Sequence, residues 1–463
     1  MLWIQIWEQW RVDIVMRIKI LIIGIVFLFS LGIVEAVTFN NTEPLNGTDT
    51  GDWMGTTTLS KIVYVPYNGL VYLAGSSGVF GVYNDTSNVT TDLRAVDTGN
   101  WIGTTSITAL TFDSTKNLVY LAGSSGVFGF YNISSNKTTD LRGADPGDWI
   151  GTTSIAALTF DSTKNLVYLA GSSGLFGVYN ASTNVAFDLS ATDTGDWIGN
   201  TGFNHLTYDS TRDLIYLSGN NGNFGVYNAS SNKTTNLSGT DTGNWFGNIF
   251  INSLAYDSTR GVIYLAGSNP GLFGVYNVSK NVSFDLSGTD TGNWIGGSTY
   301  NYIKTSTYDS TRDLVYLGGG SLAGEPGLFG VYNATSNVTS DLRATDRGNW
   351  IGTVDIKYMT YDSSKGLIYL VGSSALFGVY NGTINFPIIV TDSCTYSSGA
   401  WSIAASDNCV ISSNTNLGGN DVIVTGTGTL TISSAGKIDN FGKIAVHGSG
   451  ATITCRNTAG CFG

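Results

Sequence analysis

The chain has 463 residues, which is long enough for two or three domains with large cores. Its 34 acidic residues outnumber its 22 basic residues, the net charge is −12, and no basic block occurs. Nucleic-acid binding is excluded as a main function, because phosphates require clustered Lys and Arg. The 60 glycines and the 12% of charged residues favour β-strands joined by tight turns.

The N-terminal segment has the features of an export signal. Arg17 and Lys19 precede an apolar run at 20–34 that ends near a small residue. We predict a signal peptide over 1–36, with Met16 as an alternative true start. An uncleaved membrane anchor is the other interpretation, although spanning a bilayer takes about 20 residues. In both cases the remainder is secreted or displayed at the cell surface, and any membrane contact is through this segment alone.

Seven tryptophans mark an internal repeat. Their spacing is 48 to 56 residues, and they are Trp53, Trp101, Trp149, Trp197, Trp245, Trp294 and Trp350. A period of this length is typical of propeller blades or solenoids. Helical repeats are excluded, because no unit has a 3.6-residue apolar pattern.

Each repeat is predicted to form four short strands, which in the second unit are 106–112, 118–123, 127–132 and 138–144. The two middle strands are apolar on both faces, as strands packed between layers are. The last strand is polar and belongs on the outside. This pattern predicts a β-propeller blade with its small-residue strand innermost.

The ends of the repeat array complement each other. Residues 39–47 align with fourth strands such as 87–95, which places Leu45 opposite Leu93, and the seventh unit has no fourth strand of its own. We therefore predict an all-β, seven-bladed propeller closed by one N-terminal and three C-terminal strands, which removes exposed sheet edges. The predicted propeller covers 37–382.

The repeat also carries a resemblance. The unit FDSTKNLVYLAGSSGVFGFYN at 112–132 resembles the repeats of secreted YVTN-type and two-component-regulator-type β-propellers, and the resemblance covers 38–381. It implies the propeller fold. It implies no particular function, since propellers carry out many unrelated tasks.

The motif DTGDWIG at 193–199 and its relatives precede the first strands. We expect Asp193 to accept turn N–H groups, Gly195 to supply a positive φ, and Trp197 to pack between blades. The motif resembles the Asp-box of sialidase-like propellers and the tryptophan-docking motif of quinoprotein dehydrogenases, which are structural in those families. Two aspartates leave most calcium ligands unfilled, so we predict no metal and no cofactor.

No catalytic residue is predicted. The repeat arginines are spread one per blade instead of forming the triad of sialidase chemistry, and they are Arg94, Arg142, Arg212, Arg260, Arg312 and Arg343. His205 and His447 belong to different domains, and no GxSxG or HExxH motif occurs. His205 replaces Ala109 and Ala157 of the preceding units, and we expect it to line the channel as a passive polar residue.

Asparagine sequons recur between the third and fourth strands. Five pairs are candidates for glycosylation: Asn84 and Asn88, Asn132 and Asn136, Asn228 and Asn232, Asn277 and Asn281, and Asn333 and Asn337. The alternative is that these residues serve as turn formers.

Length variation among the repeats is confined to one face. The sixth unit gains residues at 296–304 and 318–327, and the fifth gains one at 268–271. Both connections emerge on the face opposite the sequon turns. Because loops on rigid scaffolds often carry recognition, we predict a ligand-binding patch of Tyr300, Tyr302, Lys304, Glu325 and Asn269. The alternative is drift of tolerated loops.

The C-terminal segment differs from the repeats. After a linker at 383–387, residues 388–463 contain all four cysteines, Cys394, Cys409, Cys455 and Cys461. Their even number predicts two disulfides in an oxidising compartment, with three pairings open. Short β runs separated by Gly and Asn resemble the right-handed parallel β-helices of some microbial surface proteins. A small β-sandwich is the alternative.

These patterns favour an exported binding scaffold for a protein or glycan partner. A structural envelope or coat protein is the alternative, because the second and third units are nearly identical. A propeller enzyme, glycosidase-like or redox, is the third hypothesis.

Overall fold

The computed structural model describes residues 42–49, 52–97, 99–192, 197–199, 201–240, 245, 247, 249–268, 271–289, 294–295, 301–321, 327–343, 351–352, 354–381, 394, 396, 401–404 and 409–463. The chain divides into two units, Met1–Ile384 and Asn385–Gly463. The predicted signal peptide and Trp350 lie outside the described residues. Among the described residues, no helix is long and apolar enough to cross a membrane.

The first unit is all-β and is built from antiparallel sets of four strands, consistent with a propeller-like fold. Two neighbouring sets are joined into one eight-stranded sheet by the pairing of Ser268 with Tyr302. In chain order the strands are β1 (Thr42–Pro44), β2 (Leu59–Val65), β3 (Leu70–Gly75), β4 (Phe80–Asn84), β5 (Val89–Asp92), β6 (Ile107–Asp113), β7 (Leu118–Gly123), β8 (Phe128–Asn132), β9 (Lys137–Asp140), β10 (Ile155–Asp161), β11 (Leu166–Gly171), β12 (Phe176–Asn180), β13 (Val185–Asp188), β14 (Phe203–Asp209), β15 (Leu214–Gly219), β16 (Phe224–Asn228), β17 (Lys233–Asn236), β18 (Phe250–Asp257), β19 (Val262–Ser268), β20 (Phe273–Asn277), β21 (Val282–Asp285), β22 (Asn301–Asp309), β23 (Leu314–Ser321), β24 (Leu328–Asn333), β25 (Val338–Asp341), β26 (Ile356–Asp362), β27 (Leu367–Gly372) and β28 (Phe377–Asn381).

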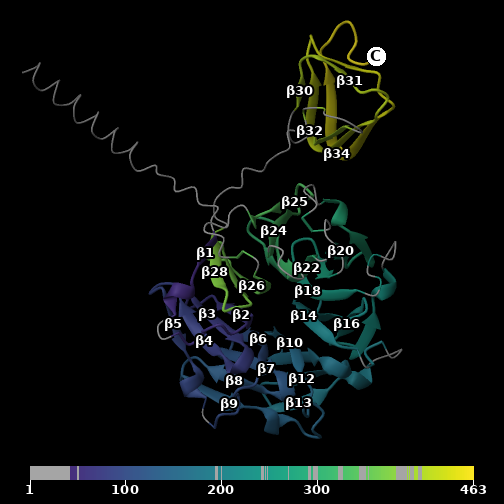
Figure 1. Cartoon of the computed structure of the whole chain (residues 1–463). Coiled ribbons are helices and arrows are strands. Elements are labelled where there is room, and N and C mark those ends of the chain that lie inside the picture. The colour runs from purple at the N-terminus through teal and green to yellow at the C-terminus, as the bar shows by residue number, and fades with distance from the viewer. Residues whose placement is uncertain are drawn as a thin grey trace, which may run out of the picture. The chain divides into compact units, whose positions relative to one another are not determined.

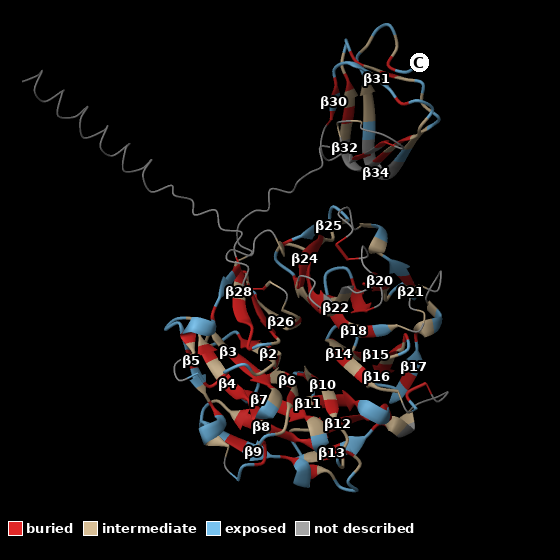
Figure 2. Ribbon diagram, viewed as in Figure 1, coloured by how far each residue is buried: buried red, intermediate tan, exposed pale blue. Residues whose placement is uncertain are grey.

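The first strand of each repeat unit is the innermost strand of its sheet. The inner strands β2, β6, β10, β14, β18, β22 and β26 contact one another in this order, and β26 also contacts β2. Figure 1 shows these strands around the middle of the unit, with the other strands of each sheet extending outward. Burial follows this arrangement, because the middle strands are the most buried and the outer turns are exposed (Figure 2). Strands apolar on both faces are thus packed between neighbouring sheets.

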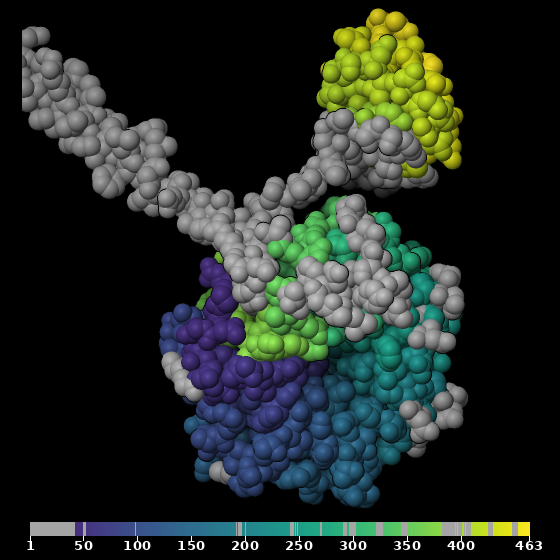
Figure 3. All heavy atoms as spheres, in the orientation of Figure 1, coloured from purple at the N-terminus to yellow at the C-terminus, as the bar shows by residue number. Residues whose placement is uncertain are grey.

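Strand β1 pairs with β28, far away in sequence. Thr42 faces Tyr380 and Pro44 faces Gly378 in an antiparallel register. The N–H of Leu45 donates to the carbonyl of Phe377 at 2.8 Å. In other sheets, the leucine that follows the fourth strand makes the same kind of bond. Strand β1 therefore lies against the last sheet, as the purple and light green atoms in Figure 3 show.

The predicted fourth strands are too long. The segment predicted as a strand over 138–144 ends as β9 at Asp140, and Arg142–Ala144 forms a 3-10 turn. The Asp140 carboxylate accepts the backbone N–H of Arg142 at 3.0 Å and pairs with its guanidinium at 2.7 Å. Side chain-to-backbone bonds of this kind compete with strand pairing, and here they end the strand.

The tryptophans lie against glycines of the third strands. A Cβ atom on Gly225 would come within 2.2 Å of the Trp197 ring. The same close approach joins Trp53 to Gly81, Trp101 to Gly129, Trp149 to Gly177, Trp245 to Gly274 and Trp294 to Gly330. We call these contacts the tryptophan seams. Trp197 shares an apolar cluster with Leu189 of the preceding sheet and Tyr227 of its own, so the ring packs between the two sheets.

The second unit is built from parallel strands. The strands β29 (Trp401–Ala404), β30 (Val410–Ile411) and β34 (Ile444–Cys455) pair with β32 (Val422–Ile432), and β31 (Asn414–Asn416) pairs with β33 (Lys437–Asp439). Every pairing among these described strands is parallel. Val422, Leu430 and Ile438 belong to its buried core.

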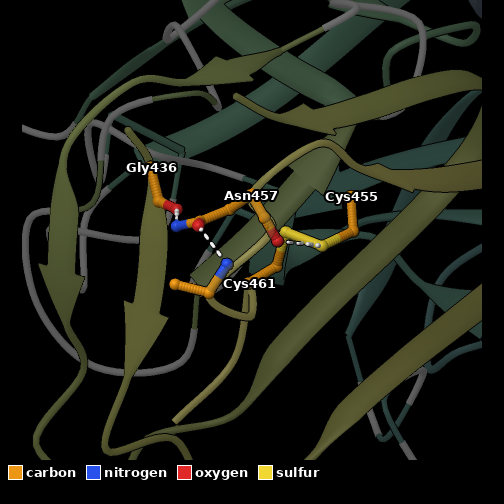
Figure 4. The surroundings of a disulfide bond; sticks show 5 residues. Gly436, Cys455, Asn457 and Cys461 are labelled. Carbon is orange, nitrogen blue, oxygen red and sulfur yellow. Dashed lines mark hydrogen bonds between the residues drawn. A yellow bond between two sulfur atoms is a disulfide. The ribbon is translucent and has the colours of Figure 1, made fainter. Parts of the chain in front are cut away.

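Two disulfides select one of the three pairings that the sequence leaves open. Cys394 bonds to Cys409, and Cys455 bonds to Cys461. Near the second disulfide, Asn457 donates to the carbonyl of Gly436 at 2.7 Å (Figure 4). This contact ties the disulfide loop to the segment before β33.

Candidate functional site

The predicted ligand-binding patch is described in part. Tyr302 and Lys304 lie on β22, whereas Tyr300, Glu325 and Asn269 lie outside the described residues. The two described residues have different surroundings, because Tyr302 pairs with the neighbouring sheet and Lys304 forms an ion pair.

The fifth and sixth sheets extend further than the others at one end. β22 and β23 have 9 and 8 residues, whereas β6 and β7 have 7 and 6. Ser268 at the end of β19 faces both Phe250 of β18 and Tyr302 of β22, which joins the two sheets. We call Phe250, Ser268 and Tyr302 the extended edge.

Phe250 was missed from sequence alone, although a signal exists. It is 44% exposed, which is unusual for so large an apolar side chain. It occupies the position just before the first buried residue of the inner strand. The successive units carry Thr58, Ser106, Ser154, Gly202, Phe250, Tyr302 and Asp355 there. The last three units thus replace a small residue with an aromatic or an acid.

Each inner strand contains a β-bulge next to this position. In β2 the register shifts between Leu59 and Lys61, so Ser60 and Lys61 are its two bulge residues. A bulge re-aims side chains and is common near functional sites. The second bulge residue differs between units and is Lys61, Ala109, Ala157, His205, Ser253, Thr305 and Tyr358.

Short side chains at the bulges connect neighbouring inner strands. The Thr108 hydroxyl donates to the carbonyl of Ile155 at 2.5 Å. The Ser253 and Ser306 hydroxyls lie 3.0 Å apart, and the N–H of Met359 donates to the Thr305 hydroxyl at 3.1 Å. These bonds satisfy polar groups between the sheets.

Longer side chains at the same positions meet one another. The Nε2 atom of His205 on β14 lies 3.3 Å from the Tyr358 hydroxyl on β26, and the two rings are stacked. Lys61 of β2 places its Nζ atom 3.9 Å from the centre of the Tyr358 ring. Three inner strands therefore contribute to one contact. Two of them, β14 and β26, belong to sheets that are far apart in chain order. His205 thus has a specific partner that the sequence did not indicate.

A group of ion pairs lies next to this contact along β26. Lys357, which belongs to the group, and Tyr358 are the two bulge residues of that strand. The Lys357 Nζ atom lies 2.6 Å from the Asp355 carboxylate, and Lys304 pairs with the same carboxylate oxygen. The side chains of both lysines are 31% exposed and that of Asp355 is 19% exposed. We call Lys61, Lys304, His205, Asp355, Lys357 and Tyr358 the axial cluster.

Burial shifts the pKa values of this cluster. Desolvation lowers the pKa of Lys61 from 10.5 to about 7 and raises that of Tyr358 to about 12. Desolvation, reinforced by the Lys61 charge, lowers the pKa of His205 from 6.5 to about 3. Burial also lowers the pKa of Lys304, and Asp355 opposes that shift. His205 and Tyr358 are thus neutral near pH 7, where Lys61 is only partly protonated.

The arginines are engaged elsewhere. Arg94, Arg142 and Arg343 pair with the aspartates two residues earlier. Arg212, Arg260 and Arg312 pair with buried aspartates three residues earlier. Among the described residues, no group of three or more His, Cys, Asp or Glu side chains is arranged to hold a metal ion.

The turn motif before the inner strands has the expected contacts where it is described. The Asp49 carboxylate accepts the N–H of Met54 at 3.0 Å, and Gly99 and Gly147 have φ values of 90° and 99°. Residues 193–196 of the quoted copy lie outside the described residues.

The sequon residues also have structural roles. Asn88 has a φ of 54°, and its side-chain oxygen accepts from the Tyr83 hydroxyl at 3.0 Å. Asn184 has the same conformation and the same kind of bond without being in a sequon. The sequon residue Thr90 is buried and donates to the carbonyl of Thr48 at 2.9 Å. The pattern therefore has a structural reason, and glycosylation stays a prediction.

No family model matches the chain, and no curated protein sequence matches it.

Proposed function

We propose that the first unit is a seven-bladed β-propeller that β1 closes by completing the last blade. The cyclic order of contacts among the inner strands and the pairing of β1 with β28 support this proposal. The parallel strands of the second unit support a β-helix-like fold for it. Two disulfides agree with export to an oxidising compartment.

The proposed function is that of an exported or cell-surface scaffold that binds a glycan or protein. The observation that carries it is the extended edge, where Phe250 and Tyr302 stand on strands that continue beyond their counterparts in other sheets. Aromatic side chains on rigid strands provide contact area at low entropic cost. The axial cluster adds cationic groups at the same end of the inner strands. We assign it binding rather than catalysis.

A glycan array probed with the full chain tests this function. The variant Phe250→Ser/Tyr302→Ser places at both positions the residue that other units carry at Ser106 and Ser154, so we expect it to fold. The matched control is Phe187→Thr, which removes an equally exposed aromatic from the outer strand β13. We expect saturable binding that the double variant loses and the control keeps. Binding that survives in the double variant, or is lost in the control as well, contradicts the proposal.

A structural coat is the second candidate, because the second and third sheets are nearly identical in sequence and would present a uniform surface. Electron microscopy of the purified chain at high concentration distinguishes it. Ordered arrays without saturable ligand binding would favour the coat.

A further inference from the structure

The axial cluster concentrates positive charge in an acidic protein. The chain carries a net charge of −12, yet Lys304 and Lys357 share the single carboxylate of Asp355, and Lys61 lies over the ring of Tyr358, the residue that follows Lys357. Asp355 already pairs with two of the lysines. Lys61 lies over the neutral Tyr358 ring, and a ring contact offsets only part of the cost of desolvating an ammonium group.

A buried donor or acceptor in the same cluster has no partner. His205 is 8% exposed, and its Nδ1 atom makes no hydrogen bond within the described part of the chain. The other ring nitrogen, Nε2, contacts the Tyr358 hydroxyl. When that hydroxyl donates to Nε2, Nδ1 carries the proton and is an unused N–H donor. Leaving such a group unsatisfied costs free energy that a ligand atom would recover.

The other units show that these side chains are not needed to build the sheets. Ala109 and Ala157 occupy the position of Lys61 and His205 in the second and third sheets, which form the same pairings. The first, fourth and seventh sheets instead bring Lys61, His205 and Tyr358 into contact. The cluster is therefore an addition to the scaffold.

We propose that the axial cluster binds an oxyanion group, a carboxylate or sulfate, carried by an acidic glycan. The lysine ammonium groups supply charge, and His205 Nδ1–H supplies a directed donor that a neutral sugar hydroxyl would use less strongly. Tyr358 holds the imidazole ring in place. This inference specifies the chemical group that the proposed binding function recognises. It rests on that function only for the claim that a glycan carries the oxyanion.

Titration calorimetry of the full chain with sodium glucuronate, sodium sulfate and glucose, at constant ionic strength, tests the proposal. We expect saturable binding of glucuronate or sulfate, with the preferred probe identifying carboxylate or sulfate, and none of glucose. Lys61→Ala and His205→Ala should each weaken binding by about tenfold, as loss of one charge-assisted contact does. Both variants copy residues present at the same position in other units. Circular dichroism checks that they fold.

The charge-matched control is Lys137→Val on the outer strand β9, where the first unit has Val89. Its affinity should equal that of the unchanged chain. Absence of saturable oxyanion binding overturns the proposal, as does an equal loss in Lys137→Val, which would indicate only general electrostatics. If the chain binds an oxyanion but binds no glycan on the array, this inference stands and the proposed function is rejected. If the chain binds glycans and Lys61→Ala does not change that binding, this inference is rejected and the proposed function stands.

Discussion

The tryptophan seams and the inner-strand bulges belong to the same repeat, but they differ in how uniform they are. Each described seam places a tryptophan on a glycine with nearly the same close approach. At the second bulge position, by contrast, the seven units use lysine, alanine twice, histidine, serine, threonine and tyrosine. One region repeats its chemistry around the unit, and the other varies it.

The difference follows from what each position contacts. A seam tryptophan packs on a glycine of its own sheet and, as Trp197 shows, shares an apolar cluster with the preceding sheet, so the same shape is required between every pair of sheets. A bulge residue is directed toward the other inner strands, where small side chains bond to the next strand and large ones meet across several sheets. The seams therefore stabilise the fold, and the bulges are free to form a site.

The largest expected effect is at a seam. We expect Trp197→Ala to lower the free energy of unfolding by about 3–5 kcal/mol, because it leaves a cavity between two sheets. Trp197 is 7% exposed and contacts residues of both sheets. Chemical denaturation monitored by circular dichroism measures the loss. A loss below about 1 kcal/mol would mean that the seams do not stabilise the fold.

The glycine side of the seam provides a matched pair. Gly225→Ala would place a methyl group within 2.2 Å of the Trp197 ring, whereas an added Cβ at Gly239 meets nothing within 4 Å. We expect the first variant to lose about 1–3 kcal/mol through overpacking and the second to change little. Equal effects in both variants would contradict the seam interpretation.

Much of the scaffold could be predicted because it repeats. Strand order, the all-β class, the buried middle strands and the position of Leu45 all follow from apolar patterning and alignment of the units. The ends of the fourth strands could not be predicted, since the bond from Arg142 to Asp140 depends on side-chain geometry.

The site was much less predictable. Sequence placed Lys304 in a loop patch, but the side chain pairs with Asp355 of the next unit. It treated His205 as a passive residue, because its partner Tyr358 lies 153 positions away, with two sheets between theirs in chain order. Contacts among inner strands of different sheets join residues at large sequence separations, and a single repeat contains no signal for them.

An intermediate effect is expected on acidification. The folded-state pKa of His205 is lowered to about 3 from 6.5, so below pH 6.5 the unfolded chain binds a proton that the folded chain does not. Stability is therefore lost as the pH falls from 6.5 toward 3. Between pH 7 and pH 5 we expect His205 to account for about 2 kcal/mol of this loss. Lys61 and Tyr358 face the imidazole, and the positive charge of Lys61 reinforces the shift.

Comparison of the unchanged chain with His205→Ala isolates this contribution, because alanine occupies the position in two other units. Denaturation curves at pH 7, 6 and 5 should show a shallower dependence in the variant. Parallel curves for the two chains would mean that the imidazole is solvated in the folded state.

The smallest effect separates the two regions most sharply, because its sign differs from that at the seams. The folded-state pKa of Lys61 is lowered by burial to about 7 from 10.5, so the charged lysine disfavours folding below that higher value. Lys61 is only partly buried, so solvent screens much of this penalty. We therefore expect Lys61→Met to raise the free energy of unfolding by about 1 kcal/mol or less at pH 7, because methionine keeps the apolar contact and loses the partly desolvated charge. The gain should shrink toward pH 10, where the unchanged chain also regains stability. Denaturation at both pH values measures it. A binding site is expected to retain residues at a cost to stability. A loss of more than about 1 kcal/mol at pH 7 in Lys61→Met would instead mean that Lys61 stabilises the scaffold.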